Sequence, residues 1–182
     1  MRYIHLLIML GVVFICSCSN NQRLKKEIVT MQSKTINLCL DSMACVYNKN
    51  EAQGAEHNHS SFKIVYYIDL PECSSCILMK KNKDWENLLD SITSCRNKLQ
   101  ACFILHPAAF NMDAFRFAVK ASAITVPVYV DTAGVFMRNN PHISDNPILH
   151  TFIIDEENRA VLLGDPVGNS QMQQLLIDIL NR

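Results

Sequence analysis

Two segments of opposite character meet at the motif Cys73-Ser74-Ser75-Cys76. Residues 62–69 are rich in branched and aromatic side chains, a composition that predicts a buried strand. Residues 76–96 carry apolar side chains at helical spacing, which predicts a helix. A thiol at the start of a helix meets unpaired N–H groups and the positive end of the helix dipole, and both favour the thiolate. The order strand, CxxC, helix is typical of dithiol redox sites.

The first 17 residues have the features of a secretory signal peptide. A positive Arg2 precedes an apolar stretch over residues 3–15, which is shorter than the roughly 20 residues needed to span a bilayer. The next residues, Ile15-Cys16-Ser17-Cys18, resemble a bacterial lipobox. That resemblance implies that Cys18 is lipidated and that the protein is held at the cell envelope, facing the periplasm, on the inner or the outer membrane. An uncleaved membrane-anchoring helix is the alternative.

The rest of the chain divides into two parts. Residues 18–61 read as a tether, a helix with Leu24, Ile28 and Met31 on its apolar side, and a polar loop. Residues 62–182 read as one domain. The chain has 17 basic and 17 acidic residues without a basic stripe, which argues against nucleic acid as a partner.

Strand and helix signals alternate through residues 62–182, which is typical of an α/β domain. Strands are predicted over residues 62–69, 101–106, 126–130, 150–154 and 160–163, the last two forming a hairpin. Asn111 is predicted to cap a helix. A capping box at Ser170 is predicted to open a final helix, which faces inward through Met172, Leu175, Leu176 and Ile179. We therefore expect a central mixed sheet flanked by helices, with an N-terminal helical extension.

This order resembles the thioredoxin-like fold, and in particular the TlpA-like thiol–disulfide oxidoreductases and related lipoproteins of Gram-negative bacteria. The resemblance covers about residues 62–182 and is carried by the CxxC motif and by residues 126–131 and 151–155. It implies that Cys73 attacks and Cys76 resolves, without a cofactor. It also implies two kinds of partner, namely cysteine-containing envelope proteins and an electron donor or acceptor.

The chain departs from this family at one important position. Active members have a cis-proline before the strand at residue 151, where this chain has Leu149. Cis peptides are nearly confined to bonds preceding proline, so we expect Leu149 to be trans. Pro147 lies two residues earlier. This departure favours an alternative function, a non-catalytic lipoprotein that binds a partner and keeps its CxxC as a structural disulfide.

Four further cysteines remain once Cys16 is removed and Cys18 is lipidated. They are Cys39, Cys45, Cys95 and Cys102, and they allow three pairings among which the sequence does not choose. The apolar run around Cys102 favours a small buried hydrophobic residue at that position.

Two other uses of reactive cysteines fit the sequence less well. A structural zinc site needs four ligands, and the residues that could join the single CxxC are His57 and His59, in the polar loop. We therefore predict no metal site. The peroxiredoxin pattern requires a threonine three residues before the reactive cysteine, where this chain has Leu70.

Overall fold

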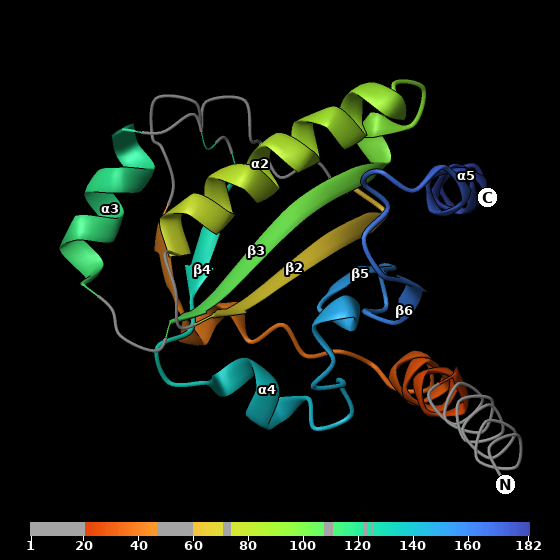
Figure 1. Ribbon diagram of the computed structural model, residues 1–182, viewed down its shortest axis with the longest axis horizontal. Coiled ribbons are helices and arrows are strands. Elements are labelled where there is room, and N and C mark those ends of the chain that lie inside the picture. Colours follow the sequence, from red (N-terminus) through yellow and green to blue (C-terminus); the bar gives the residue numbers. More distant parts are fainter. Residues whose placement is uncertain (1–20, 47–59, 71–73, 108–110, 122–123, 125) are drawn as a thin grey trace, which may run out of the picture.

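The computed structural model describes residues 21–46, 60–70, 74–107, 111–121, 124 and 126–182. Within them, six strands form one sheet in the order β1-β4-β3-β2-β5-β6 (Figure 1). The strands are β1 (Ala44–Val46), β2 (Phe62–Leu70), β3 (Leu99–Pro107), β4 (Val128–Val130), β5 (Thr151–Ile154) and β6 (Ala160–Leu163).

The sheet is mixed, with three parallel strands at its centre. β2 pairs with β3 and β3 with β4 in parallel, whereas β1, β5 and β6 each pair antiparallel with a neighbour. Parallel neighbours need a crossover connection. The helices are α2 (Ser74–Ser91), α3 (Met112–Ala121), α4 (Val135–Asn139) and α5 (Ser170–Leu180), with 3-10 turns η1 (Leu40–Ser42), η3 (Arg96–Lys98) and η4 (Pro147–Leu149). Residues 21–32 form a further helix, called here the N-terminal helix.

Each face of the sheet has its own apolar core. On one face, α2, α3 and α5 bury side chains such as Leu88, Val119 and Leu176 against β2 and β3. On the other face, the N-terminal helix, α4 and η4 contribute Met31, Phe136 and Leu149, among other residues. Because alternate residues of a strand point to opposite faces, Tyr66 belongs to the first core and Tyr67 to the second.

The expected mixed α/β architecture with an N-terminal helix is confirmed. The hairpin of β5 and β6 lies where it was predicted, and Asn111 caps α3. Its side-chain oxygen accepts hydrogen bonds from the N–H groups of Asp113, at 3.1 Å, and Ala114, at 3.0 Å. These outcomes agree with the sequence because each depends on residues close together in the chain.

Several predicted boundaries were wrong. The helix expected over residues 76–96 begins at Ser74 and ends at Ser91, and the strand expected from residue 126 begins at Val128. The cap of α5 is Asn169 and not Ser170, because the Asn169 side chain accepts the N–H of Met172.

The inward face predicted for the last helix was wrong at one residue. Leu175 is 52% exposed, whereas Leu176 and Leu180 are buried in the core beneath α2 and α5. Met172 and Ile179 are half-buried. The helix is therefore rotated slightly from the orientation that the sequence pattern favoured.

Candidate functional site

The CxxC motif straddles the junction of β2 and α2. β2 ends at Leu70 and α2 begins at Ser74, so three residues link the sheet to an 18-residue helix. Cys73 lies outside the described residues, immediately before the first helical residue in the sequence. Cys76 lies in the first turn of α2, which carries no acidic residue. A carboxylate there would oppose the effect of the helix dipole on a neighbouring thiolate.

The titratable side chains of His106 and Asp131 lie at the carboxyl edge of the sheet. His106 is next to the end of β3, in register with Asp69 of β2. The His106 ring nitrogen Nδ1 lies 2.6 Å from the carbonyl oxygen of Asp131, which follows β4. Because β2, β3 and β4 are parallel, this edge is also the one at which α2 begins. No sequence pattern pointed to a partner for His106, because the contact joins two residues that are 25 positions apart.

Asp131 has a structural role, because both of its carboxylate oxygens accept backbone hydrogen bonds. Its side chain is 1% exposed, and its two oxygens accept the N–H groups of Val135 and Phe136 at 2.8 Å each. These bonds satisfy two of the unpaired donors at the start of α4. The carboxylate therefore holds the loop beside the sheet edge in place.

Leu149 lies in the 3-10 turn η4, at the position where the family resemblance places a cis-proline. The described residues contain no cis peptide bond, which confirms that Leu149 is trans. Its side chain is 2% exposed and packs in the second core. Pro147 starts the turn, and the Asn146 side chain accepts the N–H of Ile148 at 3.2 Å. The loop is therefore shaped by a turn and a buried leucine.

The four remaining cysteines are all unpaired. None of the three possible disulfide pairings is therefore formed in the structure. Cys102 is buried, as predicted, and burial raises its pKa to about 12. The Cys95 thiol donates a hydrogen bond to Oδ1 of Asn181 at 3.1 Å, which ties the turn after α2 to the end of α5. Cys45 is exposed on the edge strand β1.

The sequence predictions for the N-terminus and the polar loop fall outside the described residues. They concern Cys18, the signal peptide of residues 1–17, and His57 and His59. Within the described part of the chain, no cluster of three histidine, cysteine or acidic side chains could hold a metal ion. No helix there combines the length and the apolar character needed to span a bilayer.

Three solved structures illustrate which proteins align with this chain. PrxQ of Xylella fastidiosa aligns with a TM-score of 0.48 at 11% identity, over 81% of this chain and 93% of that one. StoA of Bacillus subtilis aligns with a TM-score of 0.44 at 16% identity, over 68% of this chain and 84% of StoA. Yeast Sco1 with copper bound aligns with a TM-score of 0.47 at 18% identity, over 69% of this chain and 82% of Sco1. No family model and no curated protein matches the sequence.

The topology itself is that of a thioredoxin-like fold. A parallel β2-α2-β3 unit is followed, after further elements, by the antiparallel hairpin of β5 and β6, and α5 closes the chain on the same face as α2. Since one fold hosts many activities, the function has to be argued from the CxxC site and its surroundings.

Proposed function

We propose that the chain is a lipid-anchored thiol–disulfide oxidoreductase of the cell envelope, with Cys73 as the attacking and Cys76 as the resolving thiol. The single observation that carries this proposal is the start of α2 at Ser74. It gives Cys73 the sequence position just before a long helix, where unpaired N–H groups and the helix dipole stabilise a thiolate. The absence of acidic residues in the first turn supports the same role.

The proposed reaction passes two electrons between the CxxC pair and a client. The Cys73 thiolate attacks one sulfur of a client disulfide, whose S–S bond breaks as a mixed disulfide forms. The released client thiolate takes up a proton. Cys76, as thiolate, then attacks the Cys73 sulfur, so that the client leaves with its second thiol and the CxxC pair becomes a disulfide. The reverse sequence would oxidise a client.

The anchor is the second part of the proposal. The apolar stretch before Ile15-Cys16-Ser17-Cys18 supports cleavage after Ser17 and lipidation of Cys18. Acyl chains would then hold the domain at a periplasmic membrane surface. Its partners would be cysteine-containing envelope proteins and a redox partner that restores the CxxC pair.

Trapping of clients tests the proposed chemistry. A Cys76→Ala variant lacks the resolving thiol and should accumulate mixed disulfides with envelope proteins, which non-reducing gels and mass spectrometry would reveal. A Cys73→Ala variant should form none, and Cys45→Ala, which removes an exposed thiol on β1, should behave as the wild type. Recovery of no adducts with Cys76→Ala, or of the same adducts with Cys73→Ala, would contradict the proposal.

One observation favours a second candidate function, a binding module without redox chemistry. Leu149 is buried in η4 at the cis-proline position, so this loop differs from that of active family members. In that case the CxxC pair would be a structural disulfide. Alkylation of the reduced protein at neutral pH separates the two functions. A Cys73 that reacts no faster than an ordinary free cysteine, combined with failure to reduce insulin, would favour the binding module.

A further inference from the structure

We infer that the N-terminal helix holds the CxxC end of the molecule away from the membrane, so that its clients are water-soluble envelope proteins. This inference rests on the proposed lipid anchor at Cys18. The inference specifies how the anchored domain is oriented on the membrane. The orientation in turn defines the class of substrate. Three features carry it: the attachment of the helix to the domain, the short reach from Cys18, and the opposite placement of the helix and the start of α2.

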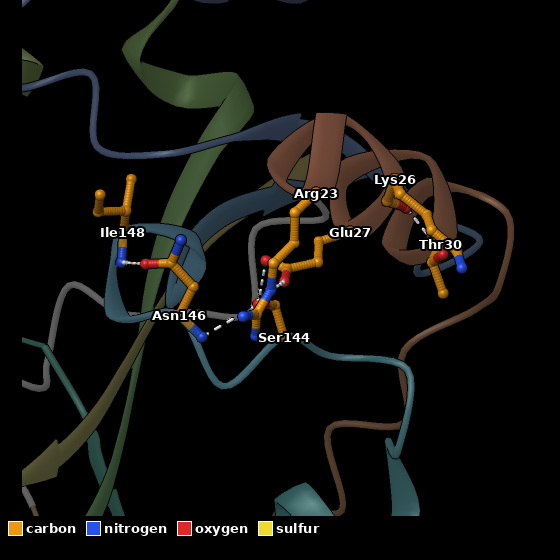
Figure 2. Close-up of polar contacts among 7 residues, drawn as sticks. All are labelled: Arg23, Lys26, Glu27, Thr30, Ser144, Asn146 and Ile148. Atoms are coloured by element: carbon orange, nitrogen blue, oxygen red, sulfur yellow. Dashed lines mark hydrogen bonds and ion pairs between the residues drawn. The ribbon is translucent and has the colours of Figure 1, made fainter. Parts of the chain in front are cut away.

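One hydrogen bond, at the centre of a small polar cluster, joins the N-terminal helix to the loop before η4 (Figure 2). The Ser144 hydroxyl donates to one Glu27 carboxylate oxygen at 2.8 Å, and Arg23 Nε pairs with the other at 2.8 Å. The Ser144 hydroxyl oxygen in turn accepts the N–H of Asn146 at 3.0 Å. The Arg23 pair and the Ser144 hydroxyl both keep the pKa of Glu27 below its usual value. The second turn of the helix is thus attached to the domain through Glu27.

Apolar and polar contacts fix the segment that follows. Met31, near the end of the helix, is completely buried in the second core. The backbone of Asn37 exchanges two hydrogen bonds with the fully buried Asn140 side chain at the end of α4, at 2.8 and 2.7 Å. The N–H of Ile36 donates to the carbonyl oxygen of Asn158 in the β5–β6 hairpin at 2.8 Å. The segment is therefore packed against the domain by both its core residues and its backbone hydrogen bonds.

The chain between the proposed anchor and this helix is short. Residues 18 and 21 are three positions apart, a stretch that spans at most about 10 Å even when fully extended. The start of the helix must therefore stay close to the membrane surface. Lys25 and Lys26 are exposed in its first two turns, which suits a surface of anionic phospholipid headgroups.

The start of α2 lies at the other end of the molecule. In Figure 1 the longest axis is horizontal, and the N-terminal helix lies at the right end while α2 begins on the left. With its right end held at the bilayer, the molecule has to point the CxxC end into the periplasm. Disulfides close to the membrane would be out of reach, whereas those of soluble proteins would be accessible.

The first test compares two substrates with full-length lipidated protein in phosphatidylglycerol-containing vesicles. One substrate is insulin in solution, and the other is a disulfide-linked peptide held at the headgroups by an acyl chain. We expect reduction of insulin and slow reduction of the anchored peptide. A variant with about 20 glycine and serine residues inserted after Asn20, spanning roughly 25 Å, should reduce the anchored peptide about tenfold faster, with insulin reduction unchanged. Equal rates on both substrates with the wild type would overturn the inference.

A second test needs no thiol chemistry and therefore separates this inference from the redox proposal. A fluorophore is introduced through a bioorthogonal side chain at Val29 or at Met79, two exposed apolar residues, on the N-terminal helix and on α2 respectively. Vesicles carry a quencher on the lipid headgroups. We expect strong quenching at Val29 and weak quenching at Met79. Equal quenching, or a full-length protein that does not remain on the vesicles, would overturn the inference even if the CxxC pair proved reactive.

Discussion

The cysteines outside the CxxC motif show that the same side chain has different properties in different surroundings. Cys102 and Cys45 lie on β3 and β1 and belong to one group of interacting side chains with Tyr129 between them. Cys45 is exposed, and its hydrogen bond with Tyr129 partly offsets the rise in pKa caused by burial. Cys102 is deeply buried, and burial raises its pKa more than the nearby charge of Lys63 lowers it. Of these two thiols, the exposed Cys45 is therefore the one that is open to reaction with a dissolved reagent.

The raised pKa of Cys102 predicts a pH dependence of stability. In the unfolded chain the thiol ionises near its ordinary pKa, whereas in the folded protein it stays protonated up to about pH 12. Unfolding in this interval therefore releases a proton, and the free energy of unfolding should fall by up to roughly 1.4 kcal/mol per pH unit. Urea unfolding at pH 8, 9 and 10 should show a shallower loss for Cys102→Val than for the wild type.

Buried tyrosines also make the free energy of unfolding fall at high pH, so the slope of Cys102→Val has to be measured beside that of the wild type. Burial raises the pKa of Tyr66 and Tyr67 as well, and both remain in the variant. A Cys45→Ala variant is the matched control and should retain most of the wild-type slope. Identical slopes for Cys102→Val and the wild type would show that Cys102 is not protected from ionisation.

At the scale of elements, α4 is the clearest departure from the sequence prediction. No helix was predicted between the strand at residues 126–130 and the hairpin, yet the five-residue helix α4 lies there. Such a short helix has little stability of its own. It forms because Asp131 caps two of its N–H groups, because Gly134 adopts a positive φ of 63°, and because Phe136 is buried in the second core.

Removal of this cap should destabilise the protein measurably. Asp131→Ala would leave the N–H groups of Val135 and Phe136 without their partner in a buried setting. We expect a loss of about 2 kcal/mol in the free energy of unfolding, measured by denaturant titration. Asp113→Ala, in the first turn of α3 with a side chain 96% exposed, is the control and should change little. A similar loss in both variants would rule out a special role for the cap.

The N-terminal segment is an integral part of the folded domain. β1 adds an antiparallel edge strand beside β4, and Met31 and Ile36 fill the second core. An isolated bridge between Thr35 and Arg159 and the bonds to Asn140 join the same segment to α4 and to the hairpin. Residues far apart in the chain therefore form a single folding unit.

This integration predicts that a single substitution in the N-terminal helix affects global stability. Met31→Ala would leave a cavity beneath the helix and should cost about 2–5 kcal/mol in the free energy of unfolding. Val29→Ala, two residues away and 57% exposed, should cost well under 1 kcal/mol. Thermal or denaturant unfolding of the two variants would measure the difference. If Met31→Ala were as stable as Val29→Ala, the helix would not be part of the folded domain.

Elements with local signals could be predicted from the amino-acid sequence alone. Strand composition, helical spacing and the Asn111 cap placed β2, β3, α2 and the start of α3 to within about five residues. The order of the predicted elements resembled that of the thioredoxin-like fold. The junction of β2 and α2 at the CxxC motif could also be predicted, because the motif and the two elements are contiguous in the chain. It also identified Cys102 as buried, from the apolar run around it.

Contacts between distant segments could not be predicted in this way and are seen only in the folded protein. The pairing of β1 with β4, the joining of Glu27 to Ser144 and the position of His106 beside Asp131 each link residues that no local pattern relates. The exact rotation of α5, with Leu175 outside and Leu180 inside, was also settled by packing against the sheet. Such contacts depend on how the whole chain excludes water from two cores at once, a property that short stretches of sequence do not contain.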